Sequence, residues 1–184
     1  MLARRDQSHL VVIDIQERVA PAVHGREAII ANAIRLVGYA GRLSVPVTFT
    51  EHMPERLGAT LPELRAAAAN DSACLAKIPF SAVREPLIAE RFEHARQAGR
   101  TQMIVAGMEA HVCVLQTALE LLADDFEVLV VADATGSRVP DNRKLSLDRL
   151  SKAGAAIVSQ EMIVFEWLER GDAAELKDLL PLIK

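Results

Sequence analysis

Three residues of this chain have the types that acyl transfer requires: a nucleophile, a base and a cation. Asp14 directly follows the apolar residues 10–13, Lys77 stands inside the apolar stretch 74–80, and Cys113 follows the turn-like residues 107–112. A carboxylate or an ammonium is costly to bury unless it is paired. Charged residues beside apolar runs are therefore candidates for chemistry.

Each of the three also has a simpler interpretation. Asp14 could cap a loop or lie in solvent at the end of a strand. Lys77 could extend its ammonium to water along apolar surface. A lone cysteine such as Cys113 is more often a small buried apolar residue. Each signal is weak alone, whereas the combination supplies all the parts of one reaction.

The elements that must position these residues follow from the hydrophobic pattern. Short runs rich in Val and Ile predict strands at residues 9–15, 45–50, 102–106, 127–131 and 155–159. Helical periodicity predicts helices at residues 27–43, 61–69, 85–98, 112–123, 142–153, 161–168 and 173–180, with a loop at 51–59. Apolar strands separated by helices indicate an α/β fold, with a parallel sheet covered on both faces.

Ligands of such sheets bind beyond the carboxyl ends of the strands. Asp14 comes at the end of the first predicted strand, and Cys113 falls in the first turn of the helix after strand 102–106. A helix N-terminus favours a thiolate over a thiol. We therefore expect both residues at the edge of the sheet where chemistry takes place.

Length and composition limit the class of protein. The 184 residues predict one domain over residues 1–184, and the 51% hydrophobic and 25% charged residues are ordinary for a globular chain. The net charge is −4 and no basic stripe is present, so we expect a small-molecule substrate and no nucleic acid. No segment approaches the roughly 18 apolar residues of a membrane span, nor a signal-peptide core, so we expect no membrane partner and a cytoplasmic location.

The two cysteines, Cys74 and Cys113, form no C-x-x-C motif. They are too few for a disulfide scaffold or a four-thiolate zinc site. A reduced compartment with one reactive thiol fits this count better.

From about His9 to nearly the C-terminus, the sequence resembles the isochorismatase-like cysteine hydrolases. The matching segments are VVIDIQ around Asp14, KIPFSA from Lys77 and AGMEAHVCVLQTALELL around Cys113. Two later segments, 127–138 and 154–168, are most similar to the subgroup called isochorismatase domain-containing proteins.

The resemblance implies a three-layer, Rossmann-like fold in which a six-stranded parallel sheet carries helices on both faces. It implies a catalytic triad of Asp14, Lys77 and Cys113, and a cis peptide bond between Met108 and Glu109. The backbone N–H groups of Glu109 and Cys113 would then form an oxyanion hole. The implied reaction is hydrolysis of a small amide or related carbonyl compound through a thioester on Cys113. Because family members usually assemble, we also expect a homo-oligomer.

The sequence departs from some members of that family. Nicotinamidases bind a metal through an Asp and two His after the second strand, whereas residues 50–54 here read TEHMP, with one histidine. A catalytic zinc usually has three protein ligands, so we expect no metal and no cofactor. True isochorismatases need no cysteine, so Cys113 favours amide or ureido substrates. His52, Phe80 and His111 are candidates for the substrate pocket, although His52 could be an exposed loop residue and His111 a helix cap.

Other classes of protein remain as alternatives. A catalytically idle interaction protein could keep this fold, and slow alkylation of Cys113, no faster than that of Cys74, would indicate it. A dinucleotide-binding oxidoreductase is disfavoured because residues 14–17 read DIQE where a G-x-G-x-x-G motif would stand. A thiol redox protein is disfavoured because no resolving cysteine lies near Cys113 in sequence.

Overall fold

The sheet has six parallel strands, and its order places the expected site at the middle. The computed structural model describes residues 1–69 and 72–183. The strands are β1 (Ser8–Ile13), β2 (Val47–His52), β3 (Ala73–Lys77), β4 (Gln102–Met108), β5 (Glu127–Gly136) and β6 (Ala156–Val158), in the spatial order β3-β2-β1-β4-β5-β6. The chain builds outward from β1 to β3, then crosses to β4 and builds toward β6. A crevice for ligands forms where the strand order reverses, at the carboxyl ends of β1 and β4.

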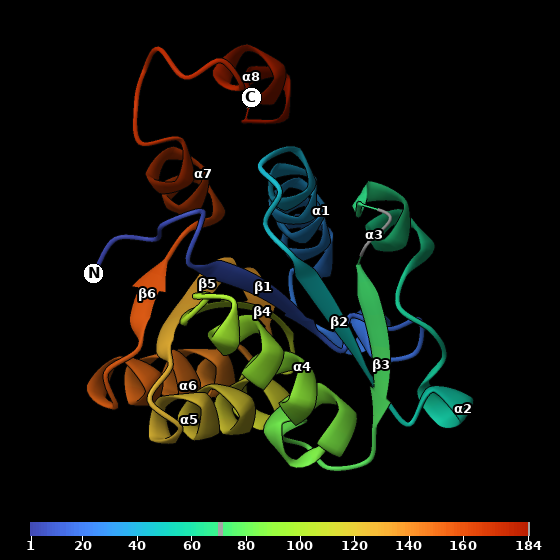
Figure 1. The fold of residues 1–184 in the computed structure, drawn as a ribbon. Coiled ribbons are helices and arrows are strands. Elements are labelled where there is room, and N and C mark those ends of the chain that lie inside the picture. Colours follow the sequence, from blue (N-terminus) through green and yellow to red (C-terminus); the bar gives the residue numbers. More distant parts are fainter. Residues whose placement is uncertain (70–71, 184) are drawn as a thin grey trace.

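Helices cover both faces of the sheet (Figure 1). The helices α1 (Arg26–Arg42), α3 (Pro62–Ala67), α7 (Gln160–Leu168) and α8 (Leu176–Ile183) lie on one side, and α4 (Pro86–Gln97), α5 (Leu115–Ala123) and α6 (Pro140–Lys152) lie on the other. A single turn, α2 (Pro54–Leu57), follows β2. This confirms the predicted three-layer α/β architecture with a six-stranded parallel sheet.

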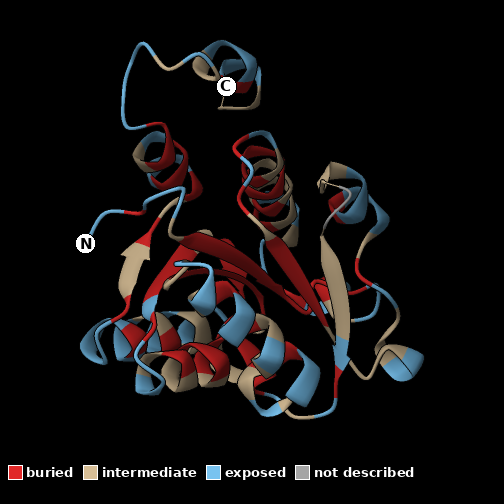
Figure 2. Cartoon of the chain, viewed as in Figure 1, coloured by how far each residue is buried: buried red, intermediate tan, exposed pale blue. Residues whose placement is uncertain are grey.

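The central strands β1 and β4 are buried along their whole length and apolar over most of it, because helices cover both of their faces (Figure 2). In β1, Leu10 and Val12 belong to the cluster that includes the inner face of α1. Val11 and Ile13 point to the opposite face and join the cluster beneath α4 and α5. Successive side chains of a strand point to opposite faces of the sheet, so β1 contributes residues to the hydrophobic core on each face.

The observed elements differ from the predicted ones at the edge of the sheet. Strand β3 was not recognised from its own residues, and only the family resemblance implied a sixth strand. Most of β3 is half-buried because it has one neighbouring strand, so it lacks the continuous apolar pattern of β1. The predicted loop at 51–59 was also partly wrong, since Glu51 and His52 belong to β2 and α2 follows them.

The start of the helix after β4 also differs from the prediction. A short π-helical turn, Ala110–Val114, precedes α5, and Cys113 lies in this turn rather than in the first turn of a regular α-helix. Within residues 1–69 and 72–183, no helix is long and apolar enough to cross a membrane.

Candidate active site

Asp14 follows β1 directly and its two carboxylate oxygens have different surroundings. The residue is 2% exposed and has a positive φ of 49°. Thr50 Oγ1 donates a hydrogen bond of 2.6 Å to Asp14 Oδ1. Oδ2 lies 2.7 Å from Lys77 Nζ as an ion pair, but it accepts no well-aligned hydrogen bond from the described residues. Oδ2 therefore keeps a lone pair available for a proton.

Lys77 ends β3 with its side chain fully buried. Besides Asp14 Oδ2, its Nζ contacts the backbone oxygens of Pro79 at 3.3 Å and Phe80 at 3.1 Å. The ammonium therefore does not reach water, in contrast to the simpler interpretation of this lysine. The desolvation of a buried ion pair often exceeds its Coulombic gain. Such a pair in a crevice therefore indicates a functional site rather than a contribution to folding stability.

Cys113 lies beside both charged groups and is 6% exposed. Burial, and after it the charge of Asp14, raises the pKa of the Cys113 thiol to about 12, although the Lys77 ammonium opposes this shift. Burial thus opposes the effect of the helix terminus, which by itself favours a thiolate. An adjacent base can still activate such a thiol at the moment of attack.

The turn that carries Cys113 is fixed by its neighbours. The peptide bond between Met108 and Glu109 is cis, as the resemblance implied. The Glu109 carbonyl accepts hydrogen bonds from the N–H groups of Val112 and Val114. The Glu109 carboxylate accepts the Arg138 N–H at 2.9 Å and lies 3.6 Å from Arg138 Nε. His111 Nδ1 is 3.0 Å from Ser137 Oγ, so residues 137–138 hold the turn at two points.

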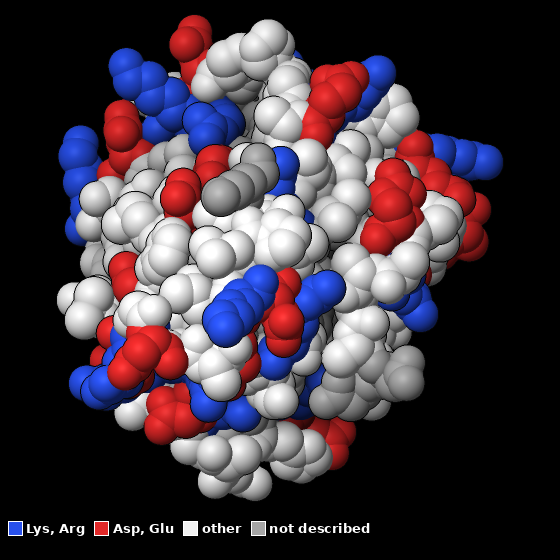
Figure 3. All heavy atoms as spheres, turned by 90° about the horizontal axis from the view of Figure 1, so that it is seen from above, with Lys and Arg blue, Asp and Glu red and all other residues white. Residues whose placement is uncertain are grey.

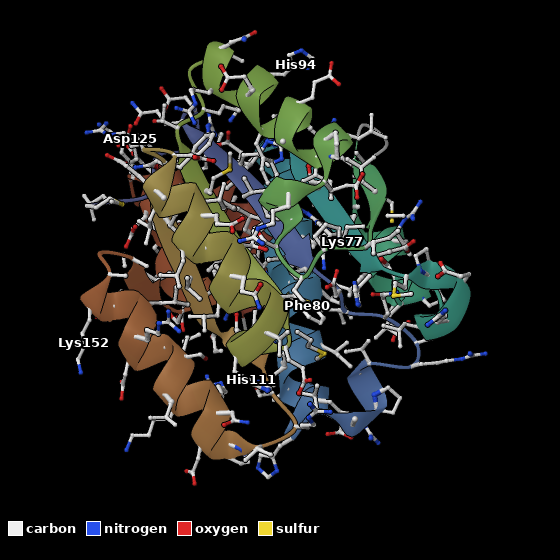
Figure 4. The ribbon with its side chains drawn as sticks, turned by 90° about the horizontal axis from the view of Figure 1, so that it is seen from below. Lys77, Phe80, His94, His111, Asp125 and Lys152 are labelled. Atoms are coloured by element: carbon white, nitrogen blue, oxygen red, sulfur yellow. The ribbon has the colours of Figure 1, made fainter. Side chains whose placement is uncertain are left out.

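His52 and Phe80 lie together beside the ion pair. Their ring centroids are 5.3 Å apart, with an interplanar angle of 41°. Burial, and after it the charge of Lys77, lowers the pKa of His52. Figure 4 shows Lys77, Phe80 and His111 at one end of the sheet, whereas His94 lies at the other. The structure thus places all three predicted pocket residues at the carboxyl ends of the strands.

Two residues of the site had no predicted role. Thr50 was read as an ordinary strand residue, although it hydrogen-bonds the Asp14 carboxylate. Gln16 accepts the His52 N–H at 2.8 Å and donates to the carbonyls of His52 and Gly58, which holds the segment after β2 in place. Gln16 stands in the VVIDIQ segment, two residues after Asp14, and that proximity is the one signal that pointed to it.

The arrangement does not present a metal centre within the part of the chain that the structure describes, where no group of three or more His, Cys, Asp or Glu residues converges. Beside His52, Glu51 Oε1 accepts the Thr60 N–H at 2.7 Å. A surface hollow of about 490 Å³, lined by residues that include His9 and Arg91, lies near the amino ends of β1–β3, away from Cys113.

A family model for the isochorismatase domain matches residues 8–162. The chain belongs to the isochorismatase family. Among its relatives, isochorismatase domain-containing protein 2 of Bos taurus is 34% identical over 179 residues, covering 96% of this chain and 83% of the relative. The secreted isochorismatase effector Isc1 of Phytophthora sojae is also 34% identical over 179 residues, covering 96% and 84%.

Isochorismatase domain-containing protein 1 of Danio rerio is 34% identical over 173 residues, which is 93% of this chain. The chain spans 59% of the length of that relative. These matches confirm the resemblance predicted from the sequence.

Solved structures show the same fold. The MAR1 ribonuclease of Caenorhabditis elegans has a TM-score of 0.93 and 31% identity, covering 100% of this chain and 92% of its own. The YcaC gene product of Escherichia coli, described as an octameric hydrolase of unknown specificity, has a TM-score of 0.90 and 23% identity, covering 99% and 90%. The chain therefore has the hydrolase fold of the isochorismatase family.

Proposed function

We propose that this chain is a cysteine hydrolase that cleaves a small amide or related carbonyl compound through a thioester on Cys113, without a metal. One observation carries the proposal: a buried thiol lies beside a buried carboxylate–ammonium pair whose Asp14 Oδ2 has no aligned hydrogen bond. These groups lie at the carboxyl edge of the sheet, where the strand order reverses.

The reaction begins with transfer of the Cys113 proton to Asp14 Oδ2. The sulfur attacks the carbonyl carbon as the proton leaves, and the Lys77 ammonium offsets the negative charge that this creates. Backbone N–H groups of Glu109 and Cys113 stabilise the oxyanion; one such donor typically contributes about 3 kcal/mol. Asp14 then gives the proton to the departing amine, leaving a thioester. Asp14 next takes a proton from a water molecule whose oxygen attacks the thioester carbonyl carbon. The C–S bond then breaks, which releases the acid, and Asp14 returns the proton to the Cys113 sulfur.

The first test is intact mass spectrometry of the protein with a panel of small amides. We expect an acyl adduct that maps to Cys113. Cys113→Ala should abolish adduct and turnover while the protein stays folded, and Cys74→Ala is the matched control that should retain both. Hydrolysis by the Cys113→Ala variant at the wild-type rate would refute the proposal.

An idle interaction protein is the competing proposal. Burial raises the pKa of Cys74 as well as that of Cys113, so neither thiol is expected to react quickly unless a base assists it. We expect iodoacetamide to alkylate Cys113 at least tenfold faster than Cys74 at pH 7.5, because only Cys113 lies beside Asp14 and Lys77. Equal slow rates would favour the idle protein.

RNA is the second candidate substrate, because the C. elegans neighbour carries the name ribonuclease. The charges favour a carbonyl compound, since proteins bind phosphate backbones largely through Lys and Arg that are free to contact them. At this site Lys77 is paired with Asp14 and Arg138 with Glu109. Figure 3 shows acidic and basic side chains interspersed on the face seen from above. Cleavage of labelled RNA by the wild type would favour the ribonuclease.

We also propose that the protein is a homo-oligomer, as the E. coli neighbour is described to be. Met162 and Phe165 on α7 are each nearly half exposed, at 49% and 47%. Leu2, which is 67% exposed, lines a surface hollow together with Phe165. Neighbouring apolar side chains on a surface are typical of protein–protein contacts.

A further inference from the structure

We propose that the Cys113 site selects substrates whose acyl group is uncharged and carries an apolar, flat substituent that packs on Phe80. This inference rests on the proposed function and specifies its substrate class. Three features of the site support it: the oxygen atoms around the buried cation, the pairing of the neighbouring arginine and the apolar side chains at the mouth of the site.

The Lys77 ammonium is surrounded by oxygen atoms of its own chain. An ammonium carries three N–H groups. At this site three oxygens surround Nζ, from the Asp14 carboxylate and from the backbone of Pro79 and Phe80. The side chain is fully buried, so an incoming carboxylate would have to displace one of these partners. The charge of Lys77 is committed to Asp14 and to the thiolate that forms during attack.

A second cation near the nucleophile is also paired. Arg138 Nε lies 3.6 Å from the Glu109 carboxylate, and the Arg138 backbone N–H donates to the same Oε2. A substrate carboxylate close to the scissile bond would therefore meet Asp14 and Glu109, each already holding its own cation. Like charges disfavour each other most strongly in a partly desolvated site. The pairing thus favours a neutral acyl group.

The mouth of the site presents apolar side chains. Ile78 and Phe80 follow Lys77 directly and are 74% and 50% exposed. Large exposed apolar side chains beside a reactive group indicate a binding surface. The Phe80 ring packs in a tilted arrangement on the His52 ring, and the Phe80 carbonyl contacts Lys77 Nζ. The ring is therefore held at a defined place next to the ammonium, where a flat substituent can stack on it.

The charge preference can be measured without knowing the substrate. Iodoacetamide and iodoacetate are nearly the same size and differ in charge. Each is reacted with the whole protein carrying Cys74→Ala, and alkylation of Cys113 is followed by intact mass, with free glutathione as the reference thiol. We expect the rate ratio of iodoacetamide to iodoacetate on Cys113 to exceed that on glutathione by at least tenfold. An equal or inverted ratio would overturn the charge preference.

The apolar preference is tested with N-phenyl-iodoacetamide in the same assay. We expect the phenyl group to accelerate alkylation of Cys113, relative to iodoacetamide, by at least fivefold. Phe80→Ser should remove that acceleration, measured as the ratio of the two rates within the same variant. Leu145→Ser is the matched control, since Leu145 is 65% exposed on α6, and it should keep the acceleration. A phenyl effect that survives Phe80→Ser would overturn the role of Phe80.

Different results would contradict the cysteine hydrolase and its substrate class. If Cys113 reacts no faster than Cys74 with any of the three reagents in the unsubstituted protein, the cysteine hydrolase itself is wrong. If Cys113 reacts quickly but without preference for neutral or phenyl-bearing reagents, the hydrolase stands and the substrate class is wrong.

Discussion

At the scale of single residues, Thr50 orients the Asp14 carboxylate, which is the proposed base. Its hydroxyl donates to Asp14 Oδ1, which leaves Oδ2 facing Lys77 and the thiol. Thr50→Val removes the hydroxyl but keeps the shape of the side chain. We expect it to slow alkylation of Cys113 about tenfold, because the Asp14 carboxylate becomes free to rotate. A lost hydrogen bond to a charged group is worth about 1.5–3 kcal/mol. Thr50→Ser keeps the hydroxyl and should behave as the wild type.

The buried ion pair gives a second prediction at this scale. Lys77→Met leaves the Asp14 carboxylate buried without its cation, which we expect to lower the free energy of unfolding by about 3–5 kcal/mol in urea denaturation. The double variant Asp14→Asn with Lys77→Met removes both charges, and Asn tolerates the positive φ of position 14. It should recover most of the lost stability and no activity. Additive losses in the double variant would contradict this account.

The three candidate residues of the site could be named from the sequence, whereas the contacts around them could not. Asp14, Lys77 and Cys113 were named from their positions in sequence and from the family resemblance. Thr50 could not be named, because its contact with Asp14 depends on the register in which Ile13 pairs with Thr50 across β1 and β2. The raised pKa of Cys113 likewise depends on burial, which sequence position does not reveal.

At the scale of elements, the close approach of β4 to β1 requires a glycine. Gly107 has φ +133°, and a Cβ built on it would overlap the backbone of Ile13. We expect Gly107→Ala to lower the free energy of unfolding by more than about 4 kcal/mol, because backbone atoms would have to move. Gly154 has φ +107° and open space around it, so Gly154→Ala introduces backbone strain without a clash. We expect it to lower the free energy of unfolding by about 1–3 kcal/mol. Similar losses at both positions in urea denaturation would contradict the clash.

The elements themselves were predicted well where both faces are buried and poorly at the edge. The patterns of β1 and β4 are continuous apolar runs, because helices cover both of their faces. β3 escaped recognition although it carries Lys77, since a half-buried edge strand has no such run. The residues that bring the cation to the site were thus the least visible in the sequence.

At the scale of the whole molecule, His9 makes stability depend on pH. Burial, and after it the charges of Arg91 and Arg100, lowers the pKa of His9 from 6.5 to about 3. Between these values the unfolded chain holds a proton that the folded chain lacks, so the free energy of unfolding falls as the pH falls. The slope is at most about 1.4 kcal/mol per pH unit. His9→Gln should flatten it, whereas His94→Gln, at a largely exposed position, should not. Equal slopes in urea denaturation from pH 6.5 to 4 would contradict the assignment.

The proposed assembly gives a prediction at the same scale. Phe165→Glu places a charge in the exposed apolar surface of α7 and should lower the oligomeric mass measured by light scattering after size exclusion. Leu145→Glu alters an exposed apolar residue of α6 and should leave the mass unchanged. A wild-type monomer would exclude the assembly.

The Asp14–Lys77 ion pair joins the edge strand β3 to the centre of the sheet. It also constrains which substitutions this sequence can accept during evolution. Losing either Asp14 or Lys77 alone strands a buried charge, so each single replacement passes through a less stable protein. Losing both together removes that penalty. The pair therefore resists stepwise replacement, since a descendant that loses one of the two charges passes through a less stable protein before it loses the other.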